Sequence, residues 1–76
     1  SPTSVKRAIK RLHKALEEIT VLDYIVAAGH PALIAAAGAI QADATGFIRI
    51  LCWDNQTQRY ALVEEQMYED DSGSGD

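Results

Sequence analysis

The chain has 76 residues, with seven Lys and Arg against eleven Asp and Glu, a formal net charge of −4 and a single cysteine. A chain this short forms one domain with a thin stability margin, because it buries only about 60% of the surface that its unfolded form exposes. One thiol excludes an intrachain disulfide, and one Cys with two scattered His excludes a four-ligand zinc site. We therefore expect no metal or other cofactor, and we expect oligomerisation to supply the missing stability.

Residues 24–42 are the one stretch that must be weighed as a membrane span. They carry no formal charge and approach the ~20 residues that a spanning helix needs, but most are Ala or Gly, and His30 and Pro31 interrupt the middle. We expect no membrane span. The basic start of the chain leads into acidic residues rather than an apolar core, so we expect no secretory signal and a cytoplasmic protein with a reduced Cys52.

Residues 4–19 have the pattern of an amphipathic helix. Apolar side chains recur there at the three- and four-residue spacing of a single helix face. They are Val5, Ala8, Ile9, Leu12, Leu16 and Ile19. The stripe changes phase near residues 20–22, which predicts a bend or break in the helix. Whether residues 20–28 continue the first helix stays open.

Two further helical pieces are predicted after the break. Asp23 can cap a piece that runs through Ala28, and Gly29 suits its C-terminal stop. Pro31 suits the first turn of the next helix, which we expect over residues 32–41. This last piece is rich in small residues, so it can pack close to a neighbouring element.

Residues 47–53 have the composition of a β-strand, and the alternating residues 59–65 follow a polar stretch. We expect a hairpin with Asp54–Gln58 as its loop and with Trp53 opposite Arg59. One face, packed on the helices, would then carry Ile48, Ile50, Cys52, Tyr60 and Leu62. The other face would carry Phe47, Arg49, Leu51, Trp53, Arg59, Ala61 and Val63. This second face is still substantially apolar, which favours a partner.

A winged helix-turn-helix is the alternative for the same region. In that interpretation Gln41–Asp43 form the turn, residues 44–53 form a recognition helix, and the next segment is a wing strand. Gln41 stands where such turns favour Gly, Gly46 weakens the second helix, and Arg49 would be its one cation. A groove-reading helix needs positive charge for phosphates, so the hairpin is favoured.

Charge is distributed unevenly along the chain. Five of the seven cations lie on one broad side of the first predicted helix: Lys6, Arg7, Lys10, Arg11 and Lys14. Acidic residues collect at the other end, and no cation follows Arg59. Residues 69–76 are acidic and rich in Gly and Ser, which predicts a disordered tail after a single small domain over residues 1–68. Whether this tail is native stays open.

These observations predict a small α+β domain of two or three N-terminal helices followed by a C-terminal β-hairpin. No set of residues has the spacing of a catalytic site, so we expect a non-enzymatic protein-interaction module, such as a regulator, adaptor or inhibitor, that binds a protein partner or itself as a homodimer. The residues expected to bind the partner are Phe47, Arg49, Leu51, Trp53, Arg59 and Tyr60. No small-molecule substrate is inferred, and the partner and oligomer number stay open.

The alternative function is a nucleic-acid-binding regulator. It would bind nucleic acid, or an acidic partner, with the basic side of the first helix, through Lys6, Arg7, Lys10, Arg11 and Lys14. A solvated helix face has the same charge pattern, and no aromatic residue is interleaved with these cations, which argues against stacking on single strands.

Overall fold

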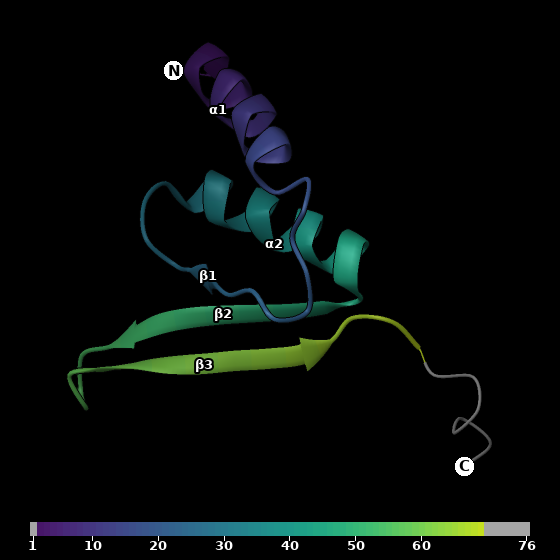
Figure 1. Cartoon of the computed structure of the whole chain (residues 1–76). Helices are drawn as coiled ribbons and strands as arrows, with labels where there is room; N and C mark the ends of the chain where they lie inside the picture. Colours follow the sequence, from purple (N-terminus) through teal and green to yellow (C-terminus); the bar gives the residue numbers. More distant parts are fainter. Residues whose placement is uncertain (1, 70–76) are drawn as a thin grey trace.

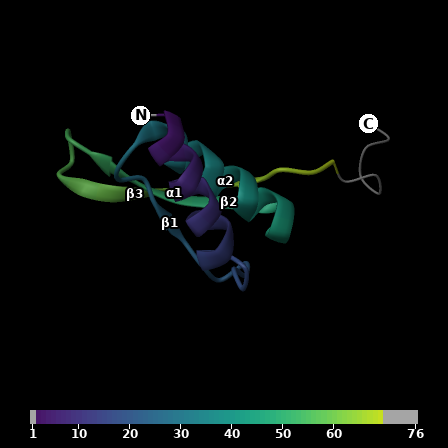
Figure 2. The same cartoon turned by 90° about the horizontal axis from the view of Figure 1, so that it is seen from above.

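The two helices and the sheet of this protein form three stacked layers in the computed structural model, which describes residues 2–69 (Figure 1). Helix α1 (Pro2–Ala15) lies on helix α2 (Pro31–Thr45), and α2 covers one face of the sheet. The sheet contains β1 (Ile25–Val26), β2 (Phe47–Asp54) and β3 (Arg59–Gln66), in the order β1-β2-β3. Seen from above, α1 crosses over α2 (Figure 2). The predicted α+β class is confirmed.

Helix α2 is the middle layer because it is apolar on all sides, with Asp43 as its only charged residue. Its first turn has Pro31 as predicted, and the His30 Nδ1 accepts a hydrogen bond of 3.0 Å from the Ala32 N–H. The helix ends at Gly46, which has a left-handed φ of 80° and donates its N–H to the Ala42 carbonyl. These two caps fix where the chain enters and leaves the layer above the sheet.

The segment between α1 and α2 differs from the prediction. Helix α1 ends at Ala15 rather than near residue 19, and the helical piece predicted from Asp23 to Ala28 is wrong. Asp23 instead accepts a hydrogen bond from the Thr20 N–H in a turn, and the next residues form β1, parallel to β2. The β-branched side chains of Ile25 and Val26 explain this preference, since such residues fit a pleated sheet better than a helix.

The hairpin is confirmed, but its predicted register is wrong by one residue. Trp53 lies opposite Tyr60, and Asp54 opposite Arg59, so the loop contains residues 55–58. Gln58 adopts a positive φ of 56° and donates its N–H to the Asp54 carbonyl, which closes a tighter loop than predicted. A one-residue shift moves every side chain of a strand to the other face. Tyr60 and Leu62 therefore leave the helix-facing side of the sheet, and Arg59, Ala61 and Val63 take their places.

The helix-turn-helix alternative is wrong. The residues that would form its turn, Gln41–Asp43, lie within α2, and the segment that would form its recognition helix is mostly strand β2. Gly46 ends α2 rather than lying inside a second helix. The question of whether residues 44–53 are helix or strand is thereby settled in favour of a strand from Phe47 onwards.

The core is small. Within residues 2–69, only Ala37 and Gln41 are buried, and every residue of β3 is exposed. Helix α2 packs over β2 and leaves both faces of β3 open. Within the same range, no helix has both the length and the apolar character needed to cross a bilayer. The predicted acidic tail lies outside the described residues except for Glu69, so it stays a prediction.

Candidate partner-binding surface

One face of the sheet has no helix over it. Ile50 faces α2, since its Cδ1 lies 3.9 Å from where a Cβ on Gly38 would be, so its neighbours along β2 face the other way. Residues that lie directly opposite one another in a sheet share a face. The residues of β1 and β3 that lie opposite these outward-facing residues of β2 are therefore on the same uncovered side. The face, called the outer face below, comprises Tyr24, Val26, Phe47, Arg49, Leu51, Trp53, Tyr60, Leu62, Glu64 and Gln66.

The part of the outer face that runs from Leu51 to the hairpin loop is apolar and largely exposed. Val26, Leu51 and Leu62 form one row across the three strands, and Trp53 and Tyr60 form the next row on β2 and β3. The Trp53 and Tyr60 residues are 48% and 57% exposed, and their rings meet edge to face with centroids 5.2 Å apart. Large aromatic side chains are enriched at the centres of protein interfaces, and exposed apolar patches mark interaction sites.

The hairpin loop holds Trp53 in place. The indole N–H donates to Asn55 Oδ1 at 2.9 Å, and the Asp54 carboxylate accepts a hydrogen bond of 2.9 Å from the Gln56 N–H. Asx turns of this kind stabilise tight loops. The polar edge of the indole is therefore paired within the loop, while part of its apolar body stays open to solvent.

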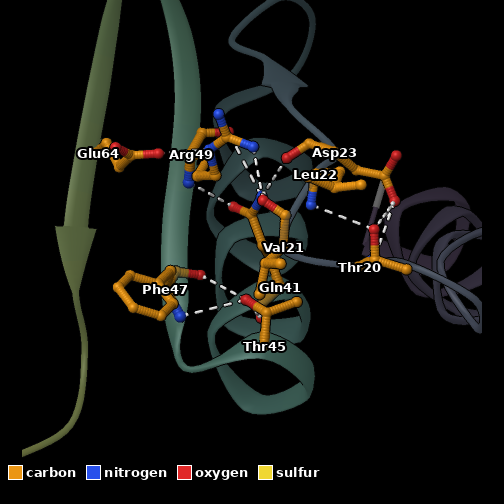
Figure 3. A network of polar contacts seen from close by, with 9 residues as sticks. All are labelled: Thr20, Val21, Leu22, Asp23, Gln41, Thr45, Phe47, Arg49 and Glu64. Carbon is orange, nitrogen blue, oxygen red and sulfur yellow. Dashed lines mark hydrogen bonds and ion pairs between the residues drawn. The ribbon is translucent and has the colours of Figure 1, made fainter.

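Arg49 is the cation of the outer face and lies beside its apolar rows. Its guanidinium pairs with Glu64 on β3 and donates to the Val21 carbonyl (Figure 3). It also lies 4.2 Å from the centroid of the Tyr24 ring. Desolvation acts to lower the pKa of Arg49, but the hydrogen bond and charge interaction with Glu64 and the interactions with Tyr24 outweigh it, so the pKa lies above its ordinary value. Arg49 is charged at every physiological pH and ties β3 to the segment before β1.

Gln41 supports Arg49 from α2, on the other side of β2. Its Oε1 accepts the Arg49 backbone N–H at 2.9 Å, and its Nε2 donates to the carbonyls of Asp23 and Arg49 at 3.3 and 3.4 Å (Figure 3). The pairing of β1 with β2 starts at Ile25 and Ile50, so Asp23 and Arg49 lie just outside the ladder and have no partner strand there. Gln41, which is 1% exposed, supplies the hydrogen bonds that such a strand would make. Sequence reasoning missed this role, although a lone amide in an apolar helix is a visible signal.

The predicted partner-binding residues divide between the two faces. Phe47, Arg49, Leu51 and Trp53 share the outer face as predicted, and Tyr60 joins them because of the corrected register. Arg59 lies on the opposite face, beside Asp54 at the loop end of β3. Five outer-face residues were absent from the predicted set: Tyr24, Val26, Leu62, Glu64 and Gln66. The Ile25-Val26 pair was the available signal for a third strand.

The basic residues predicted as an alternative site lie on α1, the layer farthest from the sheet (Figure 1). All five are exposed, α1 contains no acidic residue, and the one ion pair within residues 2–69 is that of Arg49 with Glu64. They are Lys6, Arg7, Lys10, Arg11 and Lys14. The basic layer and the acidic residues of β3 are therefore at opposite ends of the molecule.

The remaining surface offers less chemistry. A groove of about 430 Å³ lies between the end of α1 and α2, with Leu16 and Ile40 on its walls and His13 and Asp43 at its rim. Within the described part of the chain, no three His, Cys, Asp or Glu side chains are grouped so that they could hold a metal ion.

Comparison with known proteins identifies a family. The family described as "Phage Pam3 gp32-like protein" matches residues 1–67, most of the chain, so the chain belongs to it. No curated protein and no solved structure matches the chain.

Proposed function

We propose that this member of the Phage Pam3 gp32-like family is a small non-enzymatic protein-interaction module that binds its partner with the outer face of the sheet. A single observation carries the proposal: a sheet face with no helix over it exposes the large apolar side chains of Tyr24, Val26, Trp53, Tyr60 and Leu62. In a monomeric domain such a face has no structural use, because its apolar surface is left in water.

Polar groups within the outer face add specificity. Arg49 is held at a fixed position by Glu64, Val21 and Tyr24, so it requires little ordering when a partner binds. Trp53 and Tyr60 lie beyond it as aromatic anchors, the residue types that dominate the binding energy of interfaces. A partner that fits this face needs an apolar centre and an acceptor or anion near Arg49.

The experiment compares protein capture by the wild-type chain and by a Trp53→Ser/Tyr60→Ser variant. The matched control is Leu22→Ser/Val63→Ser, which removes exposed apolar side chains outside the outer face. We expect a partner that the wild type and the control retain and the outer-face variant loses. Equal retention by all three chains, or no protein partner of the wild type, would contradict the proposal.

A second candidate function has its own support in α1. Five exposed cations on a helix without acidic residues form a surface that can lie along phosphates. If α1 binds nucleic acid, affinity for DNA must fall steeply with salt, and Lys10→Glu/Arg11→Glu must abolish it, whereas Arg59→Glu must not. A flat titration at low salt would exclude this function.

A further inference from the structure

Besides the outer face, the free edge of β3 is a surface without a partner within the described residues. The sheet order β1-β2-β3 places β3 at an edge, with no strand on its other side within residues 2–69. This edge is eight residues long and exposed along its whole length, and it contains neither Pro nor Lys. Natural proteins protect long edges with Pro and with charged side chains, because unpaired N–H and C=O groups recruit other strands. The charged residues of β3, Arg59, Glu64 and Glu65, lie toward its two ends, so residues 60–63 carry no such protection.

The backbone hydrogen bonds show which groups point outward from this edge. The Met67 N–H donates to the Gly46 carbonyl, whereas the Arg49 N–H, opposite Glu64, donates to Gln41 and not to β3. In an antiparallel pair, hydrogen-bonded and non-hydrogen-bonded residues alternate. The N–H and C=O groups of Tyr60, Leu62 and Glu64 therefore point away from β2, toward solvent.

We propose that β3 pairs antiparallel with β3 of a second copy of this chain, with Leu62 opposite the partner's Leu62 on the two-fold axis. This inference goes beyond the proposed function, because the homodimer uses the free edge of β3 and leaves the outer face open to another partner. Tyr60 then lies opposite the partner's Glu64, and all the outward-pointing backbone groups meet complementary groups. The two sheets become one sheet with both α2 helices on the same side and a continuous outer face.

Charge complementarity selects this register. Arg59 and Glu65 lie on the same face of β3, at opposite ends of the strand. With Leu62 at the axis, each Arg59 lies directly opposite the partner's Glu65, so two pairs of opposite charges form by symmetry. Shifting the axis to Ala61 or Val63 places Arg59 opposite an apolar residue, and a parallel arrangement brings like charges together.

Disulfide cross-linking tests the register residue by residue, in a Cys52→Ala background that removes the native thiol. Directly opposite residues in a hydrogen-bonded pair have Cα atoms roughly 5.5 Å apart, within reach of a disulfide. We expect oxidised Leu62→Cys to form a covalent dimer, and Ala61→Cys and Val63→Cys to stay uncross-linked, because each lies about 8 Å from its copy. Cross-linking at position 61 or 63 alone overturns the register.

Mass measurement in solution tests the dimer itself. We expect the wild-type chain to form dimers, Arg59→Glu to weaken them by about tenfold or more, and Arg59→Glu/Glu65→Arg to regain affinity. Lys10→Glu makes the same charge change on α1 and must leave the dimer intact. A wild type that is monomeric by mass, with no Leu62→Cys cross-link, overturns this inference. Capture of another protein through Trp53 and Tyr60 is measured separately, so the proposed function can survive that result or fail on its own.

Discussion

Substitution of Gln41 should lower the free energy of unfolding, because its side-chain amide pairs with three backbone groups. Replacing it with Met keeps the length and flexibility of the side chain but removes the acceptor for the Arg49 N–H and the donor to the Asp23 and Arg49 carbonyls. A buried backbone group left without a partner costs about 1–3 kcal/mol. The two bonds from Nε2 are long, at 3.3 and 3.4 Å, so we assign most of the loss to the 2.9 Å bond from Arg49.

We therefore expect Gln41→Met to lower the free energy of unfolding by about 2 kcal/mol, out of a total of roughly 4–11 kcal/mol for a domain of this size. The corresponding fall in melting temperature is roughly 8–16 °C. Urea unfolding followed by far-ultraviolet circular dichroism measures the change. The amide of Arg49 should also exchange with solvent faster than in the wild type, because it loses its acceptor.

The matched control is Gln56→Met, which makes the same substitution at an exposed position of the hairpin loop. Its free energy of unfolding should stay within about 0.5 kcal/mol of the wild type. If Gln41→Met is no less stable than this control, or if the Arg49 amide keeps its protection from exchange, Gln41 does not replace a strand partner.

Three further substitutions test the capping and the outer face. Gly46→Ala should destabilise the protein by more than about 1 kcal/mol in thermal unfolding, because a Cβ there meets the Tyr68 ring at 2.8 Å and φ is positive. Gly29→Ala, with positive φ but open space, should cost less, and equal losses would refute the contact. His30→Ala should cost about 1 kcal/mol in urea unfolding by removing the cap of α2, and His30→Asn should restore it; an unchanged midpoint would refute the cap. Arg49→Lys should lower the denaturation midpoint in the same assay, because Lys lacks the planar fork that reaches both Glu64 and the Val21 carbonyl; an unchanged midpoint would show that charge alone suffices.

The sequence predicted those elements whose signals are local. The apolar stripe of α1, Pro31 at the start of α2 and the alternating hydrophobic residues of β2 and β3 each identify their own element, and all of these elements are present. The α+β class follows from them. Likewise, Phe47, Arg49, Leu51 and Trp53 share a face because alternate residues of any strand do.

The errors arose where the structure depends on contacts between distant residues. Two residues of β1 form a strand only because β2 lies beside them, and in isolation Asp23 resembles a helix cap. The register depends on Gln58 adopting a positive φ, which is uncommon for any residue but Gly and Asn. That single backbone angle moved Tyr60 and Leu62 to the outer face, and with them a large part of the candidate partner-binding surface.

Site-specific photo-cross-linking distinguishes the two candidate functions most directly. A photoreactive phenylalanine analogue replaces Trp53 on the outer face in one chain and Lys10 on α1 in another, and each chain is irradiated in a cell extract. We expect a discrete protein adduct from position 53 and none from position 10. Adducts from position 10 alone, with protein or nucleic acid, would contradict the assignment of the outer face as the partner-binding surface.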